Sequence, residues 1–466
     1  MKQGKYLLLF VSLVFVLVSC KKELDLNPTD TFSEANSFIT LSDVQLGANG
    51  AYGRYSAYEN DIYFNALLSD EVKLGLDNAG QGALTYRYQF SADPTTGGDV
   101  VAAWGDYYGM IDQVNRVLPF IPTVTATPAE EPRRDIIKGQ LLALRAIAHF
   151  GLLQAYSKNY DPAEVLGISI MLTSDPLAKP ARNTMAEVMT QIEADFAEAR
   201  SLLPAVTAAT FSDTVMNKVN IAAYQARIAL YRKDYDAAIT FASEVITANV
   251  KPLAGLTDFP QIWTDNNDFE TLFRIRYATS TAIGGLWGTT AGQYYIAPSD
   301  KLFASYDASD IRRDIYIGDD GAGNHYVNKF YLSSRGGLIV DMKACRIAEM
   351  YLIRAEAYAK RSSPDIIAGA LDLNLLRTNR ITGYVDETFA TSAVLADAVL
   401  QERFKELAFE GFRFYDLKRN NLPVQRLASD ANPAWQTLVA GDFKFVLPIP
   451  RNDLQANPNL VQNAGY

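Results

Sequence analysis

Apolar residues recur at helical spacing along most of this chain. Residues 134–156 place Ile137, Leu141 and Leu144 three and four positions apart, and the stripe continues to Leu152. This period is typical of an amphipathic helix. Small residues occupy a second face of the same segment, where they allow a neighbouring helix to approach closely. We therefore expect this helix to pack on two sides.

A second pattern predicts helices that are paired by tight turns. Residues 217–248 carry small apolar residues at helical spacing on both sides of the turn Lys233-Asp234-Tyr235. The arrangement resembles a tetratricopeptide repeat, in which helical pairs stack because neither helix can bury its apolar face alone. Further segments with this period are 184–203, 344–360, 364–377 and 393–411. The sequence thus predicts a mostly α-helical fold with a scaffold of stacked, tetratricopeptide-like pairs.

Two long stretches without helical period, residues 74–99 and 277–338, interrupt the helices. Loops of this length in a compact protein are usually functional or disordered. Both stretches contain several aromatic residues, which disordered segments lack. We therefore expect these irregular loops to be ordered on the helical scaffold and to form the ligand site.

The two loops combine aromatic and polar side chains, which is the mixture that a sugar requires. A sugar ring has an apolar C–H face and a hydroxylated rim, so it fits a flat aromatic ring with polar groups at its edge. Trp287 lies in the glycine-rich stretch 283–288, which would let its ring project from the surface. The alternative for each aromatic is a place in the cover of the helical core. The candidate ligand-binding residues are Asp77, Asn78, Tyr86, Trp287, Tyr294, Tyr295 and Tyr326.

The first twenty residues predict processing and lipidation. Lys2 and Lys5 precede an apolar run over 6–18, which is shorter than the roughly 20 residues that span a bilayer and is typical of a signal peptide. The run ends in Leu-Val-Ser-Cys20, which resembles the bacterial lipoprotein box, although a buried, inert Cys20 is the alternative. We expect residues 1–19 to be removed and residues 20–30 to form a lipidated tether, since two or more acyl chains anchor a protein stably.

Composition and charge exclude several classes of function. The chain has 43 Lys and Arg against 53 Asp and Glu, a net charge of −10, and no basic block, which argues against nucleic-acid binding. Two cysteines and two histidines leave few ligands for a zinc or thiolate site. The acidic clusters at 265–268 and 319–320 could hold a calcium ion through oxygen ligands, but neither has the spacing of an EF-hand, and we favour a role in turns. The sequence contains no nucleophile elbow, P-loop or zinc-protease motif. We assign no metal site and expect no cofactor.

A block of alternating charge covers residues 401–419. If it is helical, its charged residues form a ladder along one face. Glu406 and Glu410 could be the acid and base of a glycosidase, or they could pair with Arg403 and Arg413 in a structural network. Nearby arginines lower carboxylate pKa values, whereas a general acid needs a raised pKa. We therefore favour the network and expect no catalytic residue.

The same block resembles the ERxxELAFEGxRxxDLxR motif of the SusD/RagB family of Bacteroidetes outer-membrane nutrient-binding lipoproteins. Residues 346–357 are similar to the RxAExYLIxAEA helix of that family, and 374–377 match its NxxR. Residues 447–450 match its LPIP ending, and 144–156 resemble its long LRAxxYFxLxxxY helix. The resemblance extends over the whole chain after the signal peptide.

This resemblance implies both an organisation and a role. It implies an N-terminal SusD-like helical region over 31–260 and a C-terminal RagB/SusD region with variable loops over 261–466. It also implies a lipid-anchored outer-membrane protein that faces the cell exterior, binds an oligosaccharide or polysaccharide without altering it, and delivers it to a SusC-like TonB-dependent barrel. The alternatives are a RagB-like peptide receptor, or a glycoside hydrolase that uses two loop carboxylates such as Asp77 and Asp300.

Overall fold

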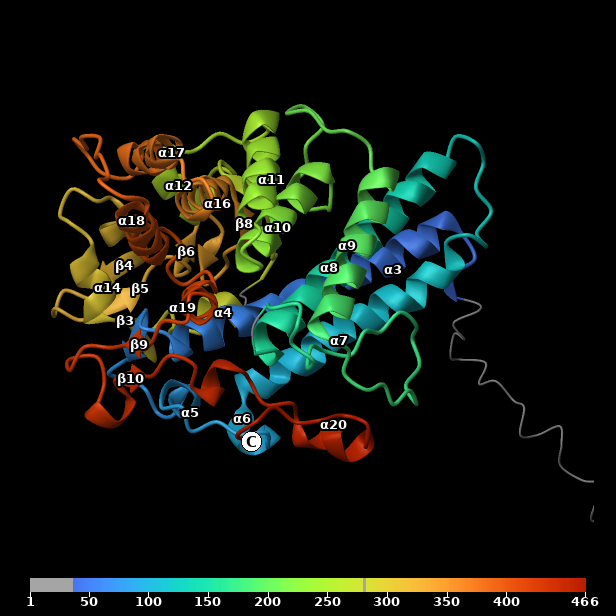
Figure 1. The fold of residues 1–466 in the computed structure, drawn as a ribbon, viewed down its shortest axis with the longest axis horizontal. Helices are drawn as coiled ribbons and strands as arrows, with labels where there is room; N and C mark the ends of the chain where they lie inside the picture. Colours follow the sequence, from blue (N-terminus) through green and yellow to red (C-terminus); the bar gives the residue numbers. More distant parts are fainter. Residues whose placement is uncertain (1–36, 159, 280–281) are drawn as a thin grey trace, which may run out of the picture.

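The computed structural model describes residues 37–158, 160–279 and 282–466. The predicted signal peptide, Cys20 and the tether lie outside the described residues and stay predictions. Helices are the main regular element of the described body, and short strands join loops that are distant in the sequence (Figure 1). The prediction of a mostly α-helical fold is confirmed.

The N-terminal half is built around one long buried helix. Its main helices are α3 (Leu41–Gly53), α4 (Ala57–Leu68), α7 (Asp99–Val117), α8 (Glu131–Tyr156) and α9 (Met185–Leu202). Helix α8 packs against both α7 and α9, as predicted. Gly139 and Gly151 permit this approach, because a Cβ at either position would lie 3.0 Å from Leu203 and 2.4 Å from Tyr107, respectively. Helix α8 is long and apolar enough to cross a membrane, but 89% of its most apolar stretch is buried inside the fold.

The C-terminal half contains the stacked helical pairs. Its main helices are α10 (Lys218–Tyr231), α11 (Tyr235–Ala248), α16 (Ile347–Lys360), α17 (Ile366–Thr378), α18 (Ser392–Glu406) and α19 (Arg413–Arg419). Helix α10 packs on α11, α11 on α16, and α16 on both α17 and α18 (Figure 1). Side-chain caps fix where the helices of the first pair begin: Asn217 accepts the N–H groups of Val219 and Asn220, and Asp234 accepts that of Ala237.

The predicted helix over 393–411 is wrong at its C-terminal end. Helix α18 ends at Glu406, and α19 begins only at Arg413. Between them, Phe409 has a φ of 64° and Gly411 a φ of 85°, which a continuous helix does not allow. The charged residues therefore leave the helix in different directions and do not form one ladder.

The rest of the chain folds into short elements. The short helices are α5 (Ala83–Tyr86), α6 (Pro94–Gly97), α12 (Phe259–Trp263), α13 (Ala282–Gly285), α14 (Asp300–Ser305), α15 (Arg312–Tyr316) and α20 (Arg451–Ala456), with 3-10 turns η1 (Arg54–Ser56), η2 (Leu118–Phe120), η3 (Pro433–Trp435) and η4 (Phe443–Phe445). The strands pair antiparallel: β1 (Val72–Leu74) with β3 (Ile296–Pro298), β2 (Thr271–Ile275) with β8 (Met342–Arg346), β4 (Ile317–Asp319) with β5 (His325–Val327), β6 (Leu332–Ser333) with β7 (Gly336–Gly337), and β9 (Val424–Gln425) with β10 (Thr437–Leu438).

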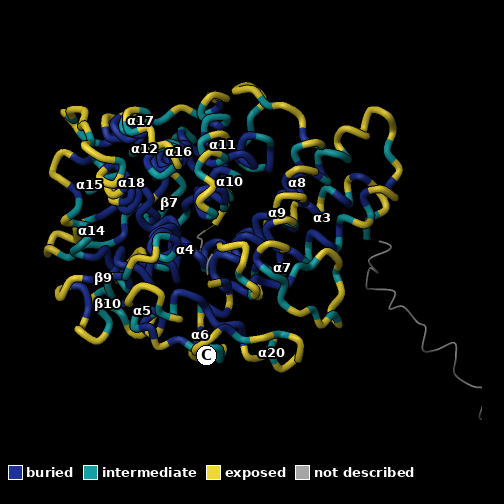
Figure 2. The backbone as a smooth tube through the Cα atoms, in the orientation of Figure 1, coloured by how far each residue is buried: buried dark blue, intermediate teal, exposed yellow. Residues whose placement is uncertain are grey.

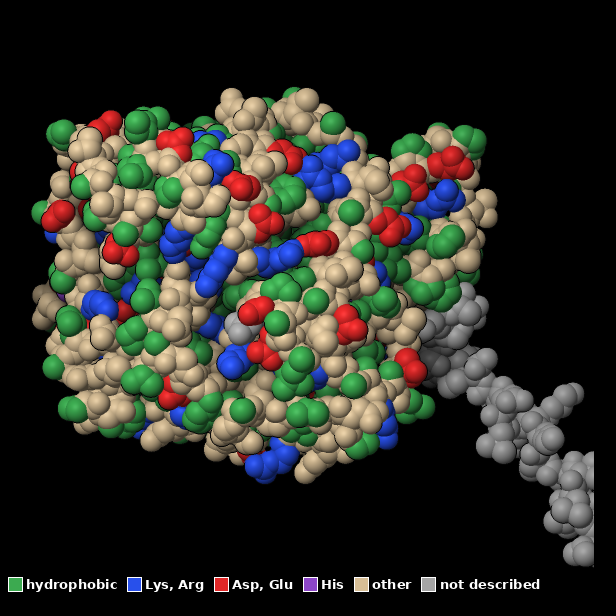
Figure 3. Space-filling model, viewed as in Figure 1, with side chains coloured by type: hydrophobic (Ala, Val, Ile, Leu, Met, Phe, Trp, Pro, Cys, Tyr) green, Lys and Arg blue, Asp and Glu red, His purple; other side chains and the backbone are tan. Residues whose placement is uncertain are grey.

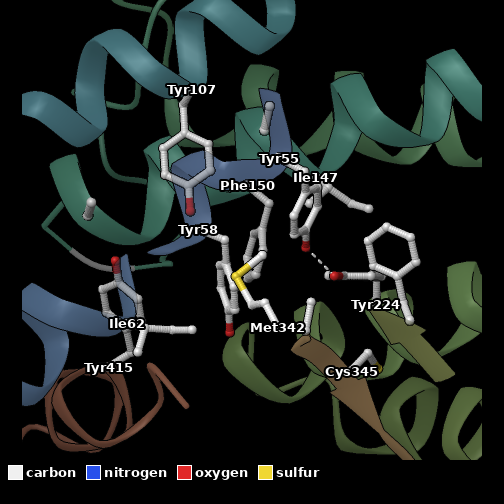
Figure 4. Close-up of a cluster of buried hydrophobic side chains, with 14 of the residues drawn as sticks. Tyr55, Tyr58, Ile62, Tyr107, Ile147, Phe150, Tyr224, Met342, Cys345 and Tyr415 are labelled. Atoms are coloured by element: carbon white, nitrogen blue, oxygen red, sulfur yellow. Dashed lines mark hydrogen bonds between the residues drawn. The ribbon is translucent and has the colours of Figure 1, made fainter. Parts of the chain in front are cut away.

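One hydrophobic core joins the two halves. Buried residues run through the middle of the molecule, and exposed residues lie on the outer turns and helix faces (Figure 2). In the part of the core shown in Figure 4, Tyr55 of the N-terminal half shares a hydrogen bond with Tyr224 of α10. Cys345 lies in the same cluster with a free thiol, and burial raises the pKa of this thiol to about 12. The thiol is therefore protonated and inert at neutral pH.

Basic and acidic side chains are interspersed on the molecular face shown in Figure 3, and neither sign forms a broad patch there. This surface matches the absence of a basic block in the sequence. A face of mixed charge does not concentrate the positive potential that a nucleic-acid backbone needs.

Candidate functional site

Strands β1 and β3 bring the two predicted loops together, although more than 200 residues separate them in the sequence. Beyond the strands, the Tyr294 N–H donates to Asp77 Oδ2 over 2.8 Å, and the Asn78 side-chain amide donates to the Tyr295 carbonyl over 3.0 Å. Four of the predicted site residues, Asp77, Asn78, Tyr294 and Tyr295, are therefore direct neighbours.

Three partly exposed tyrosines gather at this junction, and we call Tyr294, Tyr326 and Tyr331 the tyrosine cluster. The Tyr294 and Tyr326 rings are stacked, with centroids 4.6 Å apart and an interplanar angle of 6°. Tyr331 is tilted by 57° against Tyr326, with centroids 5.1 Å apart. Tyr294 and Tyr326 were predicted site residues. Tyr331 was not among the predicted site residues, because no local signal distinguishes it from the other loop aromatics.

Tyr295 does not join the cluster through its side chain. Successive side chains of an extended segment point to opposite faces, so the neighbour of Tyr294 points the other way. The Tyr295 ring is half-buried and packs against the hydrophobic core. Its contribution is its main chain, whose carbonyl also accepts the Gly75 N–H over 2.8 Å.

Glycines make room for the tyrosine cluster. A Cβ on Gly318 would lie 2.2 Å from the Tyr326 ring, and a Cβ on Gly288 would lie 3.2 Å from the Tyr294 ring. A Cβ on Gly75 would lie 2.1 Å from the Tyr294 carbonyl oxygen. Real Cβ contacts of 2.1 or 2.2 Å do not occur, so a larger residue at Gly75 or Gly318 would displace the ring or its main chain.

Three carboxylates border the tyrosine cluster, and we call Asp77, Asp319 and Asp320 the acidic edge. Among the described residues none of them has a Lys or Arg ion-pair partner, and Asp319 lies 3.9 Å from the His325 imidazole. Burial raises the pKa of Tyr326, and Tyr331, Asp319 and Asp320 raise it further. The pKa of Tyr294 is also raised, so Tyr294 and Tyr326 offer neutral hydroxyl donors at neutral pH, next to a negative potential.

The expected surface position of Trp287 is wrong. Trp287 is 3% exposed and its ring stacks on Phe330 at 6.3 Å, with Tyr63 against its edge and Phe409 at 5.7 Å. Gly284, three residues before Trp287, serves packing rather than projection. A Cβ on Gly284 would lie 2.6 Å from the Leu338 carbonyl oxygen, so this glycine lets two main chains approach each other.

Tyr86 is also a core residue and not a rim residue. It is 2% exposed, its hydroxyl donates to the Asp430 carbonyl over 2.7 Å, and the Arg426 guanidinium lies 3.9 Å above its ring. Burial raises its pKa to about 12. Tyr86 therefore secures the first loop to the C-terminal segment and has no surface left for a ligand.

The predicted alternative of a loop-based hydrolase finds no support in the geometry of Asp300. This residue forms an ion pair with Lys73. Burial alone would raise the pKa of Asp300, but hydrogen bonds from Lys73 and Ser429 lower it below its ordinary value. A general acid needs the opposite shift.

Glu406 and Glu410 form the centre of a buried ion network. Glu406 lies within 3.0 Å of guanidinium nitrogens of Arg312, Arg346 and Arg380. Burial alone would raise the pKa of Glu406, but these three arginines hold it well below its usual range. Glu410 likewise lies 2.7 Å from both Arg346 and Lys329. The structural network is confirmed, and both carboxylates stay ionised.

The predicted partners within the network are wrong. Arg403 pairs with Asp416 and Arg413 pairs with Asp70, each at 2.7 Å. Because the helix breaks after Glu406, the arginines of this block turn away from its glutamates. The glutamates instead meet arginines that arrive from the second loop and from residues 346–380.

Across residues 37–158, 160–279 and 282–466, no group of three or more His, Cys, Asp and Glu side chains is arranged to hold a metal ion. The acidic edge is too dispersed for this purpose. Asp320 instead accepts the N–H groups of Ala322 and Asn324 and thereby shapes the turn between β4 and β5.

Comparison with known proteins gives one consistent result. Residues 322–466 match a family model described as SusD family, and residues 24–230 match a model described as starch-binding associating with outer membrane. The chain is 25% identical to SusD-like protein P2 of Formosa agariphila, over 99% of this chain and 100% of that protein.

Solved structures share the fold. A SusD superfamily protein of Bacteroides thetaiotaomicron has a TM-score of 0.80 at 25% identity, with 91% of this chain and 100% of that chain covered. A putative sugar binding protein of Bacteroides vulgatus has a TM-score of 0.79 at 25% identity, with 92% and 99% covered. The predicted fold class is thus confirmed over nearly the whole described body.

Proposed function

Because the chain belongs to the SusD/RagB family, whose members are non-catalytic binding proteins, we propose that it is an outer-membrane-associated receptor that binds a glycan at the tyrosine cluster. The observation that supports this site most directly is the stacked pair Tyr294 and Tyr326, with Tyr331 tilted against it, on loops at the surface. The matching descriptions of a starch-binding model and of a putative sugar binding protein point to the same ligand class.

The tyrosine cluster supplies rings for the apolar faces of sugar units. The stack occupies one face of Tyr294 and one face of Tyr326, and both side chains remain partly exposed. Tyr331 presents its ring at a different angle. A set of rings at two orientations fits a chain that turns between successive sugar units better than a flat, fully extended one.

The borders of the cluster supply hydrogen-bonding groups. Asn324 and the carboxylates of Asp77 and Asp320 lie beside the rings, and the three tyrosine hydroxyls can donate or accept. Sugar hydroxyls need both kinds of partner. The acidic edge also makes an anionic glycan a poor ligand, so we propose that the glycan is uncharged.

The receptor delivers its glycan to a SusC-like TonB-dependent barrel, with lipidated Cys20 as the anchor and the site facing the cell exterior. A relay requires release as well as capture, so shallow stacking with a dissociation constant in about the micromolar range suits this role. The folded body is consistent with binding without catalysis, because Glu406 and Glu410 both form ion pairs with Arg346.

Binding of soluble neutral polysaccharides, followed by calorimetry and affinity electrophoresis, tests this function. Starch, laminarin and xylan are suitable probes, with Tyr294→Ala and Tyr326→Ala as site variants. Tyr358→Ala is the matched control, since Tyr358 is also partly exposed but lies on α16. We expect the site variants to lose about tenfold or more in affinity, which is about 1.4 kcal/mol, while the control binds like the unchanged protein.

Three outcomes would overturn the proposal. Release of new reducing ends in proportion to time would make the protein an enzyme. Equal loss of affinity in Tyr358→Ala and the two site variants would place the glycan elsewhere. Binding of peptides but none of the polysaccharides would instead identify a RagB-like peptide receptor.

A further inference from the structure

A cavity of about 720 Å³ lies away from the tyrosine cluster, where four segments meet. These are the stretch after α8, the turn between α10 and α11, the end of α19 and the C-terminal segment. The volume is within the range of about 300–1,000 Å³ that is typical of small-molecule sites. None of its lining residues belongs to the tyrosine cluster or the acidic edge.

Part of the cavity wall is aromatic and apolar. Tyr160 and Tyr231 line it with their ring centroids 5.4 Å apart, and Leu422, Phe443 and Phe445 add further apolar surface. Phe443 and Leu422 remain exposed, so this surface is accessible from solvent. Such a wall fits the C–H faces of a ring-shaped ligand.

Charges of both signs surround the cavity. Lys158 and Lys233 line it together with Asp161, Glu164 and Asp442. Lys418 also lines it, but its ammonium group donates to the main-chain carbonyls of Gln154 and Ser157, and burial lowers its pKa to about 7. The two lining arginines have acidic partners of their own, since Arg232 pairs with Glu193 and Arg419 with Glu356. A rim that carries both ammonium and carboxylate groups strongly favours neither an anion nor a cation.

Two of the carboxylates can still accept hydrogen bonds. Glu164 accepts the main-chain N–H of Leu166 at 3.4 Å, and Asp442 accepts that of Lys444 at 2.9 Å. A carboxylate has about four acceptor positions, so most remain open. The lysine ammonium groups supply donors, and the cavity therefore offers both kinds of partner at once.

Two buried hydroxyls at the cavity are without a partner. Tyr231 is 1% exposed and Tyr160 is 7% exposed, and neither hydroxyl makes a hydrogen bond within the part of the chain that the structure describes. Buried polar groups without a partner are rare in folded proteins. This is a second feature, independent of the cavity shape, that indicates a missing polar ligand.

We propose that this cavity is a second carbohydrate site, which holds a short, uncharged oligosaccharide between Tyr160, Tyr231 and the rim of lysines and carboxylates. Hydroxyl groups both donate and accept, so they match lysines and carboxylates together, whereas an ionic ligand would meet repulsion from one half of the rim. The second site would let the protein retain one end of a glycan while the tyrosine cluster holds another segment or another molecule.

The test uses a variant in which the tyrosine cluster is removed by Tyr294→Ala with Tyr326→Ala. Isothermal titration with maltotetraose, laminaritetraose, cellotetraose and xylotetraose then reports on the cavity alone. We expect at least one tetrasaccharide to bind with one-to-one stoichiometry. Adding Ala464→Trp, which places a large ring on the cavity wall, should weaken this binding about tenfold or more.

Ala208→Trp is the matched control, because Ala208 is likewise small and exposed but lies outside the cavity. It should leave the affinity within about twofold. Lys233→Ala with Glu164→Gln should weaken binding about fivefold while the melting temperature stays within about 2 °C, which separates a ligand contact from a folding role.

The inference is overturned if none of the four tetrasaccharides binds the cluster variant, or if Ala464→Trp and Ala208→Trp behave alike. Tighter binding of a uronic-acid oligosaccharide than of the neutral ones would also overturn it. These outcomes differ from failure of the proposed function, in which mutation of the tyrosine cluster, with the cavity intact, would lower polysaccharide affinity no more than the Tyr358→Ala control does.

Discussion

Trp287 and Tyr294 lie seven residues apart in the same loop, yet their aromatic rings have opposite surroundings. Trp287 is enclosed by Tyr63, Phe330 and Phe409, whereas Tyr294 stacks on Tyr326 at the surface. Glycines flank both rings. Gly284, three residues before Trp287, brings two main chains together, whereas Gly288 and Gly318 provide room for the Tyr294 and Tyr326 rings, which stay outside.

This contrast shows that an aromatic residue in a glycine-rich loop has no fixed role. Its position depends on which partner approaches the glycine, and that partner comes from elsewhere in the chain. Gly284 meets the main chain of Leu338, more than 50 residues away, and Gly318 meets the ring of Tyr326 across a hairpin. The buried ring should stabilise the fold, and the surface rings should bind the ligand.

The largest effect that separates these two roles is expected for Trp287→Ala. Truncating a fully buried tryptophan leaves a cavity and lowers the free energy of unfolding by about 3–5 kcal/mol. Tyr326→Ala should cost about 1 kcal/mol, because its ring is partly exposed already. Urea denaturation of both variants measures the difference. Equal losses would mean that the tyrosine cluster is as structural as Trp287.

The helical scaffold could be predicted closely from the sequence. The predicted helix over 134–156 corresponds to α8 (Glu131–Tyr156), and the pair over 217–248 corresponds to α10 and α11. These helices have a strong local period, and side-chain caps mark where α10 and α11 begin. The break after Glu406 was missed because the left-handed residue at the break is Phe409, a residue type that gives no warning of a turn.

The site could be predicted only in part. Asp77, Asn78 and Tyr294 were predicted, and the structure brings them together through β1 and β3. The burial of Trp287 and Tyr86 and the place of Tyr331 depend on contacts between distant segments. Periodicity reports which face of an element is apolar, but an irregular loop has no period, so no local signal exists for these residues.

Asp70 and Glu71, which precede the first loop, provide a second contrast: their carboxyl pKa values shift in opposite directions. Both are buried at about 1% exposure. Burial alone would raise the pKa of Asp70, but Arg413 and Lys301 lower it to about 2. Burial, together with the charge of Asp70, raises the pKa of Glu71 to about 8, and Glu71 forms no salt bridge among the described residues.

The two residues should therefore give opposite pH dependence. A raised folded-state pKa means that the contribution of Glu71 is present below about pH 4.5 and is lost as the pH rises through about 8. Glu71→Gln should thus raise the unfolding free energy by about 2–3 kcal/mol at pH 7 and change it little at pH 4.5. Urea denaturation across pH measures this gain.

Asp70→Asn is the matched control with the opposite sign. The depressed pKa of Asp70 gives stability that is present above about pH 4 and lost as the pH falls towards about 2. The substitution should therefore destabilise the protein by about 2–4 kcal/mol at pH 7, since it leaves Arg413 without its partner. If both variants respond to pH in the same direction, the assignment of these two carboxyl groups is wrong.

The smallest effect concerns the acidic edge, and it tests how the tyrosine cluster selects its ligand. Asp319→Asn with Asp320→Asn removes two charges beside Tyr326 while keeping side chains of similar size. Affinity for a neutral glycan should change by less than about twofold, whereas affinity for a sulfated or uronic-acid glycan should rise by about 0.5–1 kcal/mol at low salt. Raising the ionic strength should erase this gain, because the charges are exposed and become screened.

Calorimetry of both glycan types at two salt concentrations measures this gain in affinity. A gain that persists at high salt, or that appears equally for the neutral glycan, would mean that the carboxylates act through the shape of the hairpin and not through their charge.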